Sequence, residues 1–90
     1  MDKEQASVKQ TPRKVVRVQT GVRIEKRILK VLKGMAAYND ISLGDLIEGI
    51  VLHAFDGKIP FSGKSLKKVR EFKKIYNLDL SWEDSHKLTE

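Results

Sequence analysis

The segment that most constrains the fold is residues 15–24, VVRVQTGVRI, in which apolar and polar side chains alternate. Four of its five even-numbered positions are β-branched aliphatic residues, whereas the odd positions from Arg17 onward are polar, cationic or glycine. Because successive side chains leave a strand on opposite faces, this period of two predicts a half-buried β-strand. We find no second strand of comparable quality, and a lone strand leaves its backbone unpaired. We therefore expect it to pair with its copy in another chain.

Size and composition limit the class of protein. Ninety residues suit one small domain with tails, and a single core of that size is marginal, which also favours a dimer. The absence of cysteine excludes disulfides and thiolate metal sites. No apolar run approaches the roughly 20 residues that span a bilayer, and no secretory signal is seen. We expect a cytoplasmic protein without a membrane span.

Charge is unevenly distributed along the chain, whose net charge is +6. Residues 1–38 carry ten Lys and Arg against three acids, and residues 58–76 carry seven against one. The two other blocks, residues 39–57 and 77–90, have net charges of −4 and −3. Clustered positive charge favours a polyanionic partner such as nucleic acid, with an ordinary solvated basic surface as the alternative.

Three helical patterns follow the strand. Apolar residues recur every three or four positions from Glu25 to about Tyr38, and again over roughly residues 43–56 behind a Ser42 capping box. Gly34, inside the first pattern, suggests a close packing point. Gly57 sits where a left-handed C-terminal cap belongs. A third, basic amphipathic helix is predicted over about residues 65–76, followed by an acidic tail.

The order strand, helix, turn, helix resembles the ribbon-helix-helix (Arc/MetJ/CopG-like) family of DNA-binding proteins. The resemblance covers about residues 16–55 and rests on the spacing of Val22 and Ile24, Ile28-Leu29, Leu32, Met35-Ala36 and Ile41-Ser42. It implies an intertwined homodimer, mostly α, with an intermolecular antiparallel two-stranded sheet, and here a third C-terminal helix. The domains are then a flexible basic arm (1–14), a ribbon-helix-helix domain (15–57) and a C-terminal extension (58–90).

The outward face of such a ribbon enters the major groove of double-stranded DNA. A two-stranded ribbon fits that groove, where Gln pairs with adenine and Arg with guanine. The expected base contacts are Arg17, Gln19, Gly21 and Arg23. Glycine offers no side chain, so either the central base is not read or the strand bulges and turns Thr20 outward. The alternative for the other three is a solvated sheet face.

Phosphate contacts are expected at the start of the second helix and on the arm. Backbone N–H groups at a helix N-terminus attract phosphate, so we expect contacts at Ser42, Leu43 and Gly44, and also at Arg13 and Lys14. Capping alone would also explain Ser42. The apolar faces are expected to form the dimer core, which comprises Val18, Val22, Ile24, Ile28, Leu32, Leu46, Ile47 and Ile50.

The leading hypothesis is a dimeric, sequence-specific DNA-binding protein of bacterial type, located at the nucleoid or a plasmid and acting as a repressor of its own operon. Higher cooperative assembly on DNA is compatible with it. An antitoxin, with residues 58–90 binding a protein partner, or a plasmid copy-control protein, is a variant of the same hypothesis. The rival is a protein-interaction or membrane-surface module using the basic helix. We expect no enzymatic activity, cofactor or metal, because the two histidines are isolated and no nucleophile lies in a recognisable motif.

Overall fold

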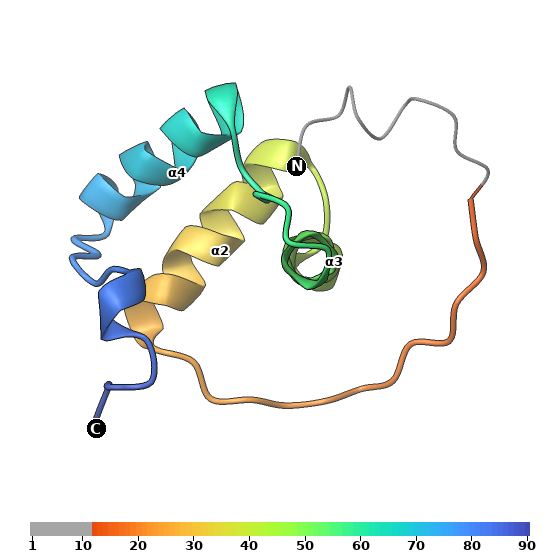
Figure 1. The fold of residues 1–90 in the computed structure, drawn as a ribbon, viewed down its shortest axis with the longest axis horizontal. Helices are drawn as coiled ribbons and strands as arrows, with labels where there is room; N and C mark the ends of the chain where they lie inside the picture. The colour runs from red at the N-terminus through yellow and green to blue at the C-terminus, as the bar shows by residue number, and fades with distance from the viewer. Residues whose placement is uncertain (1–11) are drawn as a thin grey trace.

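A computed structural model of the chain describes residues 12–90, and the first eleven residues of the expected arm lie outside that range. The described residues form three α-helices, α2 (Lys26–Asn39), α3 (Leu43–Phe55) and α4 (Gly63–Ile75), followed by a 3-10 turn, η1 (Trp82–Asp84). Helices α3 and α4 each pack against α2 and not against each other. Figure 1 shows α2 between the two, with α3 viewed along its axis.

The predicted strand over residues 15–24 is wrong, because residues 12–90 contain no β-strand. The segment runs as a long irregular connection outside the helices (Figure 1). Its apolar side chains lie in solvent, with Val16 92% exposed and Val18 79% exposed. The ribbon-helix-helix fold and its intermolecular sheet are therefore contradicted. Alternation specifies where side chains would point, but a strand exists only when a neighbouring strand bonds its backbone.

Helix α2 begins with a cap that the sequence analysis did not identify. Glu25 is the N-cap residue, and its carboxylate accepts hydrogen bonds from the backbone N–H groups of Arg27 and Ile28, at 3.0 to 3.2 Å. The helix ends at Asp40, which adopts the left-handed conformation (φ 59°, ψ 43°). Asp and Asn tolerate this conformation better than most non-glycine residues. The Ile41 N–H then bonds the Ala36 carbonyl at 3.0 Å and closes the turn.

The second helix is confirmed, together with both of its predicted ends. The Ser42 hydroxyl accepts a hydrogen bond from the Asp45 N–H at 3.1 Å, as an N-cap residue should. At the other end Gly57 has a φ of +66°, and the Lys58 N–H bonds the His53 carbonyl at 2.8 Å. This bond and the one from the Gly57 N–H to the Ala54 carbonyl form a Schellman motif.

The core of the described residues is small and centred on α2. Its buried apolar residues are Val31, Met35, Ala36 and Leu46. Helix α4 approaches α2 closely at Gly34, where a Cβ atom would lie 2.9 Å from the Phe72 ring. Glycine at position 34 therefore marks a close packing point, as the sequence suggests. Partly buried residues surround this centre, namely Leu32, Ile41, Ile50, Phe61, Val69, Phe72, Tyr76 and Leu78.

Two regions of the surface differ from the rest. One face at the end of α3 and the loop beyond it is apolar and open, with Leu52 62% exposed, Phe55 79% and Ile59 78%. The chain then returns after α4, so that its C-terminal segment lies beside the start of α2 (Figure 1). The η1 turn in this segment is capped by Ser81 and leaves Trp82 83% exposed.

Candidate nucleic-acid interface

The outward face of α4 carries a stripe of cationic side chains. Lys67, Arg70 and Lys74 are exposed and lie three and four residues apart, which places them on one side of the helix. Val69 and Phe72 lie on the opposite side and pack against the core on α2. The apolar positions therefore fix the orientation of α4, and the cations face solvent as a consequence. The helix begins two residues before and ends one residue before the predicted range.

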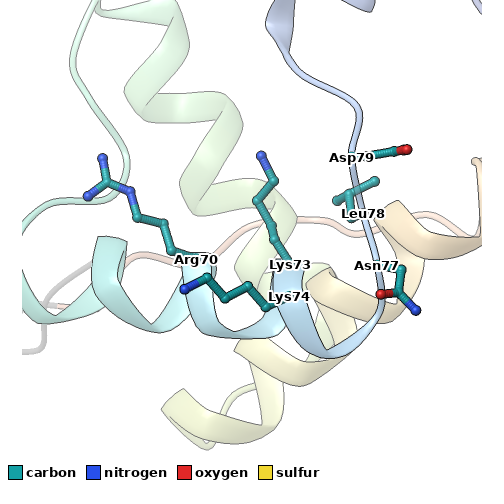
Figure 2. Close-up of a pocket in the computed structure, with 6 residues that line it drawn as sticks. All are labelled: Arg70, Lys73, Lys74, Asn77, Leu78 and Asp79. Atoms are coloured by element: carbon teal, nitrogen blue, oxygen red, sulfur yellow. The ribbon is translucent and has the colours of Figure 1, made fainter.

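A groove lies at the C-terminal end of this stripe. It has a volume of about 650 Å³ and opens to solvent, and Figure 2 shows the side chains that line it: Arg70, Lys73, Lys74, Asn77, Leu78 and Asp79. The turn after α4 creates the groove. Asn77 is left-handed (φ 54°), and the Leu78 N–H bonds the Lys73 carbonyl at 2.8 Å. This Schellman turn directs Leu78 back to the core and brings the following segment beside the helix.

The cations of the stripe and groove form no close ion pair among residues 12–90. Within residues 12–90 no carboxylate lies within 4.0 Å of the side-chain nitrogens of Lys67, Arg70, Lys73 or Lys74. Three unpaired cations and one carboxylate around an open groove suit an anion with several negative groups, such as a phosphate backbone. We call the set Lys67, Arg70, Lys73 and Lys74 the α4 cation cluster.

Glu71, the acidic residue of α4, is paired with a lysine of the same helix. Glu71 forms an ion pair with Lys68 at 2.8 Å, and the Lys68 ammonium also lies 4.9 Å from the centre of the Tyr38 ring. The hydrogen bond from Lys68 lowers the pKa of Glu71, and the nearby charges of Lys67 and Lys74 lower it further. The same hydrogen bond raises the pKa of Lys68. Glu71 is thus bonded to Lys68, while its charge also acts on Lys67 and Lys74 at longer range.

The residues predicted to contact bases do not lie together on the face of a strand. The Nε and Nη2 groups of Arg17 each donate a hydrogen bond of 2.8 Å to the Glu48 carboxylate. These bonds raise the pKa of Arg17 and lower that of Glu48. Arg23 pairs with Glu90. Gln19 and Gly21 are exposed on the irregular connection. No strand aligns the four residues on one face in the described part of the chain, and base contact at these positions stays a prediction.

The predicted phosphate contacts lie on two separate elements. Ser42, Leu43 and Gly44 form the first turn of α3, and the space where a Gly44 side chain would stand is open. Arg13 and Lys14 are exposed on the connection before α2. The structure confirms the capping role of Ser42, while phosphate binding at all five positions stays a prediction.

The predicted dimer core is divided between the interior and the surface of one chain. Leu46 is completely buried, and Leu32 and Ile50 pack against the same intrachain core. Ile28 and Ile47 are half-buried. The connection residues of the set contribute nothing to this core, because Val18 and Val22 are 79% and 75% exposed and Ile24 is 37% exposed.

Sequence reasoning missed the groove and the contacts of Arg27. The Arg27 guanidinium bonds Asp79 at 2.9 Å and the Asn77 carbonyl at 3.0 Å, and so ties the segment after α4 to the start of α2. An asparagine directly after a helical pattern was the available signal for the turn. Nothing in the local sequence indicated that this segment would return to Arg27.

Comparison with known proteins adds no relatives. No family model, curated protein or solved structure matches the chain. Function has to be argued from the residues and their geometry.

Two further findings hold for residues 12–90: they contain no group of three or more His, Cys, Asp or Glu side chains arranged to hold a metal ion, and none of their helices has the length and hydropathy needed to cross a bilayer.

Proposed function

We propose that this protein binds double-stranded DNA through its phosphate backbone, using the α4 cation cluster. The observation that carries the proposal is that, among residues 12–90, no carboxylate lies within 4.0 Å of the side-chain nitrogens of these four cations, three of which line an open groove. Positive charge held without neutralising carboxylates is available to a polyanion. The net charge of +6 favours the same class of partner.

The spacing of the cluster agrees with this partner. From Lys67 to Lys74 the helix rises about 10 Å, at about 1.5 Å per residue. DNA presents a negative charge about every 3.4 Å of axis on each strand, so this stretch of helix faces about three phosphates. The Asn77 side chain at the end of the groove adds hydrogen-bonding groups of the kind that position a protein on phosphate and sugar.

The rival hypothesis, in which α4 lies on a membrane surface, is less well supported. Membrane-surface helices bury an apolar face in the lipid boundary. The apolar face of α4 instead packs against α2 through Val69, Phe72 and Tyr76. Ile75 is the large apolar residue of α4 that remains well exposed, at 63%.

The test is the affinity of the full chain for a short labelled DNA duplex, measured by fluorescence anisotropy at several salt concentrations. About three phosphate contacts predict a loss of roughly fortyfold between 50 and 200 mM salt. The variant Lys67→Gln/Arg70→Gln/Lys74→Gln should bind much more weakly, and the slope of log affinity against log salt should fall by about 2.7.

A matched control separates the cluster from net charge. Lys33→Gln/Lys58→Gln/Lys87→Gln removes the same charge from exposed positions outside the cluster, and should leave the slope nearly unchanged. Equal losses in both triple variants, or an affinity that hardly responds to salt, would contradict the proposal. Selection from a random duplex pool then shows whether binding is sequence-specific, as a repressor requires, with the exposed Gln19 as the candidate for base recognition.

We also propose that the chain self-associates through α3. Val51, Leu52 and Phe55 lie on one face of that helix and are 37%, 62% and 79% exposed, and Ile59 follows them. Exposed apolar side chains gathered on one face of a helix are typical of an interaction site. A second copy covers it by placing the same face against itself, in the self-complementary manner of two-fold dimers, and doubles the number of α4 clusters available to one duplex.

A further inference from the structure

Three arginines, at positions 17, 23 and 27, differ from the α4 cations in one respect: each has an acidic partner from a distant part of the chain. Arg17 pairs with Glu48 on α3, and Arg27 pairs with Asp79 at 2.9 Å. Arg23 pairs with Glu90. The residues of these pairs are 31, 52 and 67 positions apart in sequence, respectively. They are therefore products of the fold and not of local chain proximity.

The C-terminal segment supplies two of the three acids. Its path is fixed at one end by Arg27, which holds both Asp79 and the Asn77 carbonyl. Its last residues, Leu88 to Glu90, then enclose a pocket of about 430 Å³ together with residues 23–26. Figure 1 shows this end of the chain beside the start of α2. An acidic segment, net −3 over residues 77–90, thus covers a basic one.

From this arrangement we infer that Glu48 and Glu90 act as internal substitutes for phosphate, so that Arg17 and Arg23 bind a polyanion in competition with these carboxylates. The inference rests on the proposed function and adds regulation to it. The α4 cation cluster offers the open site of first contact. The paired arginines form a second site, whose use depends on competition between the chain's own acids and DNA.

The chemistry of the pairs supports such competition. A carboxylate, like a phosphate, can accept two parallel hydrogen bonds from one guanidinium group. Arg17 donates both of these bonds to Glu48. The pairs are exposed, with side-chain exposures of 65% and 44% for Arg17 and Glu48 and of 85% and 78% for Arg23 and Glu90. Exposed pairs are weak, so each should reduce the affinity for DNA by about twofold to fivefold and not prevent binding.

The test compares two variants of the full chain that have the same net charge. Glu48→Gln/Glu90→Gln removes two of the internal partners. Asp56→Asn/Glu83→Gln removes two acids that make no side-chain ion pair or hydrogen bond within residues 12–90. Affinity for the same labelled duplex is measured at one salt concentration. The first variant should bind more tightly than the second by about fourfold or more, because each of the two lost pairs should contribute a gain of at least about twofold.

A second measurement assigns the gain to the arginines. In an Arg17→Gln/Arg23→Gln background the difference between the two acid variants should disappear. Equal affinities of the two acid variants, with DNA still bound, would overturn the inference and leave the proposed function standing. If wild type and all variants fail to bind duplex even at low salt, the proposed function fails and the inference fails with it.

Discussion

Gly34 is the residue at which the packing of α4 on α2 is least tolerant of change. A Cβ atom there would stand 2.9 Å from Cε1 and 3.0 Å from Cδ1 of Phe72. The ring is packed against the core and lies nearly parallel to the Tyr76 ring, with 6.3 Å between centroids. Residue 34 thus sets how near the cation-bearing helix lies to the core.

We predict that Gly34→Ala destabilises the protein despite the better helix propensity of alanine. The propensity gain is at most about 1 kcal/mol, whereas overpacking of a filled site costs about 1–3 kcal/mol. Denaturant unfolding followed by circular dichroism measures the balance. Gly44→Ala is the control, since nothing lies within 4 Å of its Cβ position, and it should be neutral or stabilising. A more stable Gly34→Ala would refute the close approach.

Acid should weaken the fold through three glutamates. Glu25, Glu48 and Glu71 have pKa values below the ordinary one, because the first accepts backbone hydrogen bonds and the other two bond basic side chains. A carboxyl with a lowered folded-state pKa stabilises the fold above its unfolded-state pKa, and that contribution is lost as pH falls through the lowered value. The thermal midpoint should therefore hold from about pH 7 to about pH 5 and decline below about pH 4.

The acid effect has its own control. Glu25→Gln/Glu48→Gln/Glu71→Gln should show a flatter dependence of the midpoint on pH than wild type, measured by circular dichroism at matched ionic strength. The three positions lie on the start of α2, on α3 and on α4, so all packed elements share in the effect. A wild-type midpoint that rose on acidification would show that these carboxylates are not paired in solution.

Among the elements, the helices could be predicted from sequence, whereas the prediction of a strand was wrong. Helix signals are local: the three- and four-residue spacing, the Ser42 cap and the Gly57 turn all act within a few residues. A strand depends on a partner elsewhere, and no partner lies beside residues 15–24 in the described chain. The α4 groove could not be predicted for a similar reason, because the segment with Asp79 that forms one of its sides is held by Arg27, 52 positions away in sequence.

The absence of a strand at residues 15–24 can be tested directly. Backbone amides that form no ladder hydrogen bonds exchange quickly with solvent. Hydrogen–deuterium exchange of the full chain at low concentration should find this segment unprotected, whereas the amides of α2 around Met35 are protected by helix and core. Slow exchange throughout residues 15–24 would require backbone bonds that the described residues do not make.

For the whole molecule, the small core and the open α3 face predict stability that depends on concentration. Four buried apolar residues are few for the 79 residues of the described range, 12–90. If a second copy covers Leu52 and Phe55, mass action raises the thermal midpoint as protein concentration increases. Leu52→Lys/Phe55→Lys should abolish the concentration dependence and yield a monomer by sedimentation equilibrium. Concentration-independent unfolding of wild type would contradict self-association.

The position of the single tryptophan decides which optical signal can follow these transitions. Trp82 stands in solvent on a short turn beyond α4 and outside the core. Its emission already comes from a ring in water, so it changes little when the helices unfold. An unfolding curve recorded by intrinsic fluorescence could look featureless while the helices melt cooperatively, and far-ultraviolet circular dichroism is the appropriate probe.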